Sequence, residues 1–300
     1  MPQKETILGL SLSDRGVQAA AIEQDGSSSN LLLAIDEWNN TLPLKAETNG
    51  AGLSQFVEYL YAFLRVNHVR TKRVSVALDS TQLFFNTVPL EEGISRLERN
   101  DQLHWELSQY FPDVQPRQFL TDVHVLTSNH TEKWMKVLSV SVKRDEASVI
   151  EKAVRRLGLS LHVVDVDHFS ADTALRINYP DSERRYLALV GIKENRLDIS
   201  LVRNGVLESY FYCTVASNAE IIDTIGKVSR ETRGLRSITV YGTYLDTDLL
   251  VQIRRGSILL VEALNPLRHV GVSTSLRLAD HLTVLSYRFA SAVGVALRRD

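Results

Sequence analysis

The residue types that most often perform chemistry occur in this sequence without a catalytic spacing. Several histidines fall on separate expected elements, and their spacing is not that of metal ligands. They are His124, His130, His162 and His168. Ser54, Ser80 and Cys213 lack the sharp turn that exposes a catalytic nucleophile. The sequence therefore predicts neither a catalytic residue nor a metal site.

Asp165 and Asp167 lie two residues apart at the end of an expected strand. Residues i and i+2 of a strand face the same side, so the two carboxylates could form an acid pair. The interpretation that we favour is that the strand ends here and that the aspartates cap the helix that follows.

The clearest element that could position such residues is a hairpin over residues 186–207. An apolar run at 187–192 leads through a polar tip to an alternating stretch that ends at Asn204-Gly205. Residues 7–26 can be laid on this hairpin without a gap. The matched positions are Ile7 on Leu187, Ser11 on Gly191, Val17 on Leu197 and Ile22 on Val202. Any two hairpins share part of this pattern, but two copies about 180 residues apart suggest two related α/β halves.

The composition is typical of a soluble globular protein. The chain of 300 residues is longer than a typical domain with a single hydrophobic core, and this length favours two domains or one domain with a large insertion. The net charge of −2 gives no general attraction to nucleic acid, and a single cysteine excludes a disulfide framework. The N-terminus lacks a hydrophobic signal core, and the apolar stretch Phe289–Leu297 is too short for a membrane span. We therefore expect a soluble, cytoplasmic protein that binds no nucleic acid, with Phe289–Leu297 as a buried helix.

Hydrophobic spacing predicts an α/β arrangement in three parts. Strands are expected at Leu31–Ile35, Arg73–Leu78, Gln82–Pro89, Phe119–Leu126, Trp134–Val142, Leu161–Val166, Glu208–Thr214, Ile238–Tyr241 and Ser257–Glu262. Helices are expected from Ser54 to about Asn67, over Gly93–Tyr110, from Asp145 to about Leu157, over Asp167–Leu175, after Ser217, after Asp246 and over most of Leu276–Leu297. Because 79–166 has strands and helices of its own, we expect it to be an insertion between a first half, 1–78, and a second half, 167–300.

Residues 74–126 carry a specific series of motifs. VSVALDSTQLFFNTVPL ends in a proline-containing strand, and a charged helix follows with Glu106 and then Tyr110-Phe111-Pro112. The next strand, LTDVHVL, contains Asp122. This series resembles the inserted subdomain of the PilM family, actin-like proteins of the type IV pilus inner-membrane platform. Residues 137–175 and 289–299 are also similar to that family. The resemblance implies an actin-like fold, with two ribonuclease-H-like halves and a small inserted α+β subdomain.

The resemblance also implies where a nucleotide would bind. The family's first hairpin contains Asp-Ile-Gly-Ser-Ser-Ser, but this chain has SLSDRG at 11–16, so the metal-side carboxylate and its glycine are replaced. The family's second hairpin contains Asp-Ile-Gly-Ala-Asn-Thr-Thr-Asp, and GIKENRLD at 191–198 retains only its Asn and its last Asp. If a nucleotide site were retained, its residues would be Ser11, Ser13, Asn195, Asp198 and Gly242.

Two further features argue against nucleotide hydrolysis. About 30 residues separate Gly205 from Ser237, too few for the subdomain that closes over adenine in the family and for the helix that follows it. Lys193 could attract phosphate, but a charged residue at a hairpin tip is expected to be solvated, and Glu194 would repel phosphate. We therefore expect no ATPase activity and no ATP or magnesium cofactor, although weak nucleotide binding stays open.

By resemblance, the chain is expected to be a non-catalytic scaffold, a degenerate PilM-like protein that lacks one subdomain, in a type IV pilus, competence or secretion apparatus. It would lie in the cytoplasm at the inner membrane and bind the N-terminal cytoplasmic tail of a PilN-like membrane partner. In the family this tail lies in a groove between the first half and the inserted subdomain. Two alternatives are a nucleotide-binding actin-like ATPase or switch, and the cytoplasmic domain of a type II secretion L-type subunit.

Overall fold

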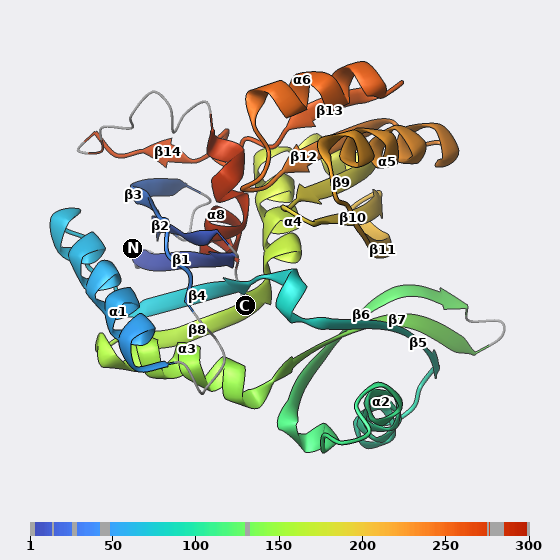
Figure 1. The fold of residues 1–300 in the computed structure, drawn as a ribbon, viewed down its shortest axis with the longest axis horizontal. Coiled ribbons are helices and arrows are strands. Elements are labelled where there is room, and N and C mark those ends of the chain that lie inside the picture. Colours follow the sequence, from blue (N-terminus) through green and yellow to red (C-terminus); the bar gives the residue numbers. More distant parts are fainter. Residues whose placement is uncertain are drawn as a thin grey trace.

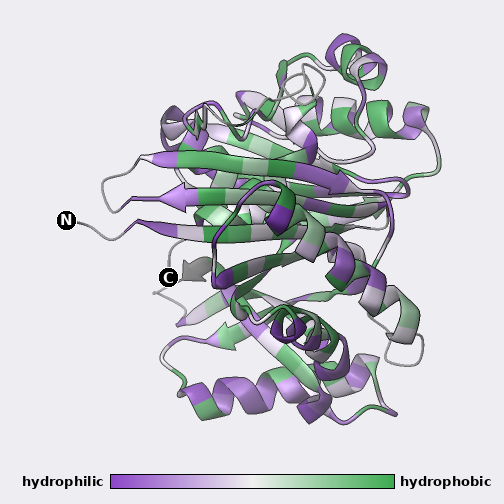
Figure 2. Cartoon of the chain, turned by 90° about the vertical axis from the view of Figure 1, so that its left-hand side faces the viewer, coloured by the Kyte–Doolittle hydropathy of each residue, from purple (hydrophilic) through white to green (hydrophobic). Residues whose placement is uncertain are grey.

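The computed structural model describes residues 4–13, 15–25, 29–42, 49–129, 133–274, 276 and 285–298. They form three β-sheets with helices packed against them (Figure 1). Many strands are hydrophobic along their middle and hydrophilic at their ends (Figure 2). One large buried cluster surrounds the first sheet and another surrounds the second, so each half has its own core.

The first half is built around a six-stranded sheet in the order β14-β3-β2-β1-β4-β8. Its strands are β1 (Glu5–Ser13), β2 (Gly16–Gln24), β3 (Asn30–Trp38), β4 (Arg73–Leu78), β8 (Ser160–Val166) and β14 (Gly271–Val272). Helix α1 (Asn49–Val66) buries Phe56, Leu60 and Phe63 in the core of this sheet. The apolar stripe predicted from helical spacing is therefore a core face.

The inserted subdomain forms the lower lobe in Figure 1 and contains a three-stranded sheet in the order β5-β7-β6. Its elements are β5 (Phe84–Glu91), α2 (Arg96–Tyr110), β6 (Phe119–Asn129) and β7 (Trp134–Lys143). A capping box of Ser95 and Glu98 starts α2, which buries Leu103 and Leu107. Helix α3 (Arg144–Arg156) then returns the chain to the first half, where its buried side chains join the first core.

The second half contains a five-stranded sheet in the order β11-β10-β9-β12-β13. Its elements are α4 (Asp167–Asn178), β9 (Tyr186–Ile192), β10 (Arg196–Arg203), β11 (Val206–Thr214), α5 (Asn218–Glu231), β12 (Ser237–Tyr241), α6 (Thr247–Gly256) and β13 (Leu260–Ala263). Between β11 and β12 the chain forms only α5, so the segment holds no further subdomain, as its length predicted.

The repeat predicted from the two hairpins is confirmed by strand register. Ile7 pairs with Ile22 across β1 and β2, and the equivalent positions Leu187 and Val202 pair across β9 and β10. Each first hairpin strand then pairs in parallel with the next strand of its half, β1 with β4 and β9 with β12. Both sheets therefore have the same order of equivalent strands, which is the signature of two related halves.

Several element boundaries differ from the sequence expectation. Helix α1 begins at Asn49 rather than at Ser54, and α3 begins at Arg144 after Lys143, without the predicted cap from Asp145. The predicted cap Ser217 is confirmed, and Asp246, where a helix was expected to begin, is the N-cap of α6; each side chain accepts a hydrogen bond from a backbone N–H of the first turn. Of the helix predicted over Leu276–Leu297, residues 277–284 lie outside the described part. The described part holds the 3₁₀ turn Ser286–Phe289 and α8 (Ala290–Leu297).

Helix α8 joins the two halves, because it packs on β1 on one side and on α4 on the other. All eight of its residues are buried, as predicted for this stretch. Strands β8 and β14 also belong to the first-half sheet, although they come from the ranges 79–166 and 167–300. Among the described residues, none of the helices is long and apolar enough to cross a membrane.

Candidate functional site

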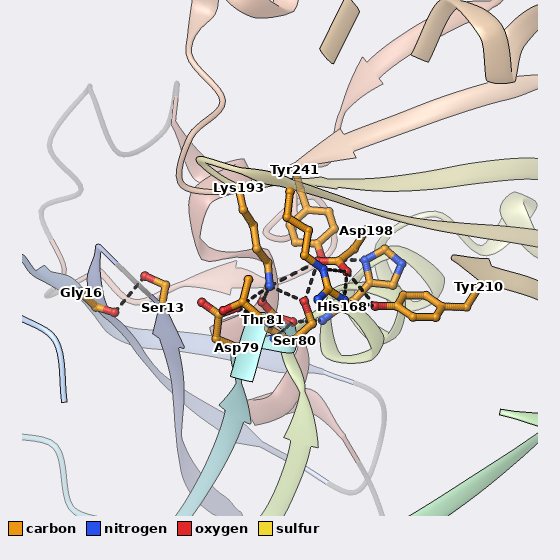
Figure 3. Close-up of polar contacts among 12 residues, drawn as sticks. Ser13, Gly16, Asp79, Ser80, Thr81, His168, Lys193, Asp198, Tyr210 and Tyr241 are labelled. Atoms are coloured by element: carbon orange, nitrogen blue, oxygen red, sulfur yellow. Dashed lines mark hydrogen bonds and ion pairs between the residues drawn. The ribbon is translucent and has the colours of Figure 1, made fainter. Parts of the chain in front are cut away.

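A buried ammonium group lies at the centre of the cleft between the two halves. The Nζ atom of Lys193 lies 2.6 Å from Asp79 Oδ1, 2.6 Å from Asp167 Oδ2 and 3.3 Å from Asp198 Oδ2 (Figure 3). The Lys193 side chain is only 9% exposed, and those of the three aspartates are 7% exposed or less. We call these four residues the Lys193 cluster.

The positions of the three aspartates follow from the topology of the strands. Leu78 and Val166 are paired on the adjacent parallel strands β4 and β8, and each is the last residue of its strand. The carboxyl ends of neighbouring parallel strands meet at one edge of a sheet, so the next residues, Asp79 and Asp167, come together there. Asp198 reaches the same point from the other half, where it pairs across the hairpin with Gly191.

Further donors, both neutral and charged, surround the carboxylate of Asp198. The hydroxyl of Ser80 donates to Asp198 Oδ2 at 2.6 Å, and the backbone N–H of Ser80 donates to Asp167 Oδ1 at 3.1 Å. The other oxygen of Asp198 accepts hydrogen bonds from Arg196 Nε at 2.9 Å and from Tyr210 OH at 2.7 Å. Ser80 also accepts a hydrogen bond from Lys193. Both carboxylate oxygens of Asp198 are therefore paired: Oδ1 with donors of the second half, and Oδ2 with Lys193 and with Ser80, which follows the first-half strand β4.

Burial and charge act in opposite directions on the ionisable groups of the cluster. Burial lowers the pKa of Lys193, but the carboxylates of Asp167, Asp198 and Asp79 raise it more, so the ammonium stays protonated. Burial raises the pKa of Asp198, but Lys193 and other nearby cations outweigh it and hold the pKa well below its usual value. Burial raises the pKa of Asp167 to about 7, against the opposing effect of Lys193.

A neutral histidine lies behind the cluster. His168 is fully buried, and its Nδ1 lies 2.9 Å from Tyr241 OH while its Nε2 lies 2.8 Å from Ser200 Oγ. Burial lowers its pKa to about 4, with Asp198 opposing this and Lys193 adding to it. His168 therefore acts as a hydrogen-bonding spacer between α4 and the second sheet rather than as an acid or base.

Asp167→Asn is expected to change how stability depends on pH. Because the folded state raises the pKa of Asp167 from 3.8 to about 7, this group makes the wild type lose stability as the pH rises from about 4 to about 7. His168 has the opposite effect, since its lowered pKa makes stability fall as the pH drops from 6.5 towards 4. In Asp167→Asn only the effect of His168 on the pH dependence of stability remains.

Urea unfolding at several pH values measures this change. The stability of Asp167→Asn relative to wild type should rise between about pH 4 and about pH 7, by at most about 1.4 kcal/mol per pH unit, and level off above that. Parallel stability curves for the two proteins would show that Asp167 is ionised throughout this range.

The five residues proposed from the family's nucleotide pattern do not come together as one binding site. Ser11, Ser13 and Gly242 line a cavity of about 20 Å³. Asp198 is buried and fully paired, as described above, and Asn195 is exposed in the β9–β10 turn. A Cβ at Gly242, whose φ is +132°, would lie 2.2 Å from the Ile192 oxygen, so this glycine serves close backbone packing.

Two sequence expectations about charged residues are wrong. Lys193 was expected to be solvated at the hairpin tip, but it is buried because Asp79 and Asp167 from distant segments, and Asp198 from the same hairpin, converge on it. The strand ends before Asp167 as expected, but neither aspartate is the N-cap residue of α4, which is Val166, and the two form no acid pair. Asp167 is the first residue of α4, and its Oδ1 accepts a hydrogen bond from the backbone N–H of His168. Asp165 instead pairs with Arg298 and accepts a hydrogen bond from Ser170.

Asp79 was not predicted from the sequence as a site residue, and Ser80 was predicted only to lack the setting of a nucleophile. The signal that could have found Asp79 is its place directly after an expected strand, in the same relation that Asp167 has to β8. Pairing of β4 with β8 was not predictable from their spacing, because the whole inserted subdomain separates them.

The residues of the cleft do not fit the magnesium nucleotide of an actin-like site. The position at which carboxylates from both halves converge is filled by the Lys193 ammonium. Pockets for small-molecule ligands typically have volumes of ~300 Å³ or more, whereas the cavity beside Lys193 holds about 20 Å³. Among the described residues, no group of three or more His, Cys, Asp or Glu could hold a metal ion.

A much larger concavity lies between the inserted subdomain and the first-half sheet. This groove has a volume of about 1090 Å³. Residues 120–124 of β6 and 164–166 of β8 form its two sides, and α4 contributes Phe169, Thr173 and Ile177. We call it the β6–β8 groove.

Both sides of the β6–β8 groove are outer strands of their sheets. No described strand pairs with the outer edge of β6 or of β8. On each edge one backbone N–H is held by the preceding carboxylate, Val123 by Asp122 and Val166 by Asp165. Leu120 and Val164 are 40% and 42% exposed there, so the edges offer apolar side chains as well as backbone groups.

The charges in the groove largely neutralise one another. Asp172 pairs with Arg176 at 2.7 Å, and Asp165 pairs with Arg298. Burial raises the pKa of Asp172, against the effect of Arg176, and burial lowers the pKa of His124 on the opposite side. The groove is therefore an apolar channel with paired charges, suited to an extended apolar segment that has few charges.

Comparisons with known proteins agree with this fold. A family model described as Type IV pilus assembly protein PilM matches residues 9–212. The solved structure of a PilM-PilN type IV pilus biogenesis complex is 17% identical, with a TM-score of 0.80 over 97% of this chain and 98% of that chain.

Two further solved structures are similar. One is a Bacteroides thetaiotaomicron protein with an actin-like ATPase fold and unknown function, 15% identical, with a TM-score of 0.53 over 94% of this chain and 96% of that one. The other is the ethanolamine utilization protein EutJ from Carboxydothermus hydrogenoformans, 11% identical, with a TM-score of 0.50 over 99% of this chain and 90% of that one. The fold is actin-like, as expected, and with the family model covering most of its length the chain belongs to the PilM family of type IV pilus assembly proteins.

Proposed function

We propose that this protein is a non-catalytic, actin-like scaffold of a pilus, competence or secretion platform at the inner membrane. In this proposal it binds the cytoplasmic N-terminal tail of a PilN-like membrane partner and lies at the membrane only through that partner. The observation that carries the proposal is the β6–β8 groove, an apolar channel with an unpaired strand edge on each side.

The geometry of the groove favours an extended peptide as its occupant. An extended segment can add to a free strand edge, where backbone hydrogen bonds supply affinity and alternate side chains enter pockets. Strands β6 and β8 each offer such an edge, and Phe169 and Ile177 of α4 lie between them. The similar PilM-PilN complex supports a PilN-like protein as the source of this segment.

The non-catalytic part of the proposal is supported by the cleft between the halves. Lys193 lies among the carboxylates that would otherwise face a metal and a phosphate. The remaining cavity of about 20 Å³ cannot accept a nucleotide in this conformation. The role of the actin-like fold here is therefore to position the inserted subdomain and the groove.

Peptide binding tests the proposal directly. The probe is a fluorescein-labelled peptide with the N-terminal cytoplasmic residues of the PilN-like protein from the same organism. We expect saturable binding to the wild type, measured by fluorescence anisotropy, and slower amide hydrogen exchange at 120–124 or 164–166. Val164→Glu places a charge in the apolar groove and should weaken binding at least about tenfold.

The matched control is Val251→Glu on α6. Val251 is 37% exposed and Val164 is 42% exposed, but only Val164 lines the groove. The control should bind the peptide within about twofold of wild type. If the wild type does not bind, or if both variants bind equally well, the groove is not the peptide site.

A further inference from the structure

We propose that the side chain of Lys193 is the permanent cation of the interdomain cleft, and that it holds the two halves closed without a nucleotide or a metal ion. The fold places converging carboxylates at this cleft, and here their counter-ion is covalently part of the chain. This inference concerns the cleft alone and does not depend on what the β6–β8 groove binds.

The contacts of Lys193 reach residues of both halves. Lys193 itself follows β9 in the second half. Asp79 directly follows the first-half strand β4, next to the entry into the inserted subdomain. Asp167 is the first residue of α4, the helix that connects the halves and lines the groove. One ammonium group thus links the end of β4, the start of α4 and the β9–β10 hairpin; Figure 3 shows its contacts with Asp79 and Asp198.

The charges around this position favour a cation. Asp79, Asp167 and Asp198 place three carboxyl groups around one point, and Arg196 reaches only Asp198. Without Lys193, two carboxylates from the first half and α4 would face Asp198 in a nearly dry cleft. Carboxylates at this separation repel strongly unless a cation or a proton lies between them.

A metal ion could neutralise the three carboxylates in place of the ammonium group only if Lys193 were absent. Calcium takes carboxylate oxygens at ~2.3–2.6 Å and magnesium at ~2.0–2.1 Å. Two of the oxygens already lie 2.6 Å from the Lys193 nitrogen, so a small contraction would bring them to calcium distances. Lys193→Ala should therefore convert a cation-independent protein into one whose stability depends on divalent cations.

The experiment compares melting temperatures in chelator and in about 10 mM CaCl₂, MgCl₂ or Mg-ATP. We expect the wild type to shift by less than about 1 °C under every condition. Lys193→Ala should melt at least about 5 °C lower in chelator. It should recover roughly half of this loss in calcium, and the double variant with Asp198→Asn should recover none.

The matched control is Lys227→Ala, which removes an exposed ion pair with Asp223. It should melt within about 1 °C of wild type and show no calcium response. A wild-type melting temperature that rises in calcium or Mg-ATP would overturn the proposal. So would a Lys193→Ala protein that is as stable as wild type, or one that calcium does not stabilise.

If Lys193→Ala does not fold, the wild type still provides a test. Acetylation of the native protein with an N-hydroxysuccinimide ester, followed by peptide mass spectrometry, reports the accessibility of each lysine. Lys193 should stay unmodified while the exposed Lys4 and Lys227 react. Equal reaction of Lys193 and Lys227 would mean that the cleft opens in solution, and the proposal would be wrong.

Discussion

Gly294→Ala is expected to destabilise the protein by at least about 3 kcal/mol, because helix α8 has no space for one more methyl group. A Cβ at Gly294 would lie 1.7 Å from the backbone oxygen of Ser170 on α4 and 2.6 Å from its carbonyl carbon. These are backbone atoms of a buried helix, so no side-chain rotation relieves the clash.

Helix α8 also cannot move away from α4. On its other side the backbone oxygen of Ala292 would lie 2.1 Å from a Cβ at Gly9 of β1, so a glycine allows the close approach there too. A shift that accommodates the added methyl group at position 294 would therefore press α8 into the first-half sheet. A displacement of α4 would in turn disturb its first residue, Asp167, which forms an ion pair with Lys193.

Urea unfolding of Gly294→Ala and of Gly50→Ala checks this prediction. Gly50 lies in α1, and a Cβ there would meet nothing within 4 Å. Its replacement by alanine should stabilise the protein by up to about 1 kcal/mol, since alanine is the better helix former. If alanine lowers the free energy of unfolding at position 294 and raises it at position 50, the loss at 294 is due to packing and not to helix propensity. A loss below about 1 kcal/mol at Gly294 would show that the two helices are less tightly packed in solution.

Much of the fold was predictable from local patterns. The ungapped match of 7–26 with 186–207 predicted equivalent registers, and the structure pairs Ser11 with Gln18 as it pairs Gly191 with Asp198. Hydrophobic spacing located most strands and helices, because each buries one face regardless of its distant partners. The actin-like class came from the motifs at 74–126, which spacing alone would not have identified.

The Lys193 cluster was not predictable in this way, because its members meet only through tertiary structure. Lys193 lies in the sequence Lys-Glu-Asn-Arg, a polar pattern that is typical of an exposed tip. Its neighbours Glu194 and Asn195 are in fact exposed. Lys193 differs from them because Asp79, 114 residues away, lies 2.6 Å from its nitrogen. A local pattern cannot distinguish a solvated lysine from one that distant carboxylates bury.

The residues of the β6–β8 groove were likewise not predictable from local sequence patterns. Both strands were predicted, but their free edges depend on the order of strands in two different sheets. Resemblance to a family predicted a groove between the first half and the inserted subdomain, without assigning residues to it. The structure assigns the sides to 120–124 and 164–166, which no spacing in the sequence connects.

Asp198→Ala is expected to cost about 3–5 kcal/mol of stability, because it leaves buried cations without their shared partner. Lys193 would keep two carboxylates, but Arg196 would lose the carboxylate that its Nε contacts at 2.9 Å, and Tyr210 would lose its acceptor. The loss should far exceed that of Asp223→Ala, whose exposed pair with Lys227 contributes less than about 1 kcal/mol.

Asp198→Asn separates charge from hydrogen bonding in this network. The amide oxygen can still accept from Tyr210 OH or Arg196 Nε, whereas the amide nitrogen must face Lys193 or Ser80, which both donate to the native carboxylate. We expect urea unfolding to place this variant between wild type and Asp198→Ala. If alanine costs less than about 1 kcal/mol, water must reach Lys193 and Arg196 once Asp198 is removed. The cleft would then be open enough in solution for exchangeable ions to replace Lys193, and the closed actin-like scaffold would need a ligand after all.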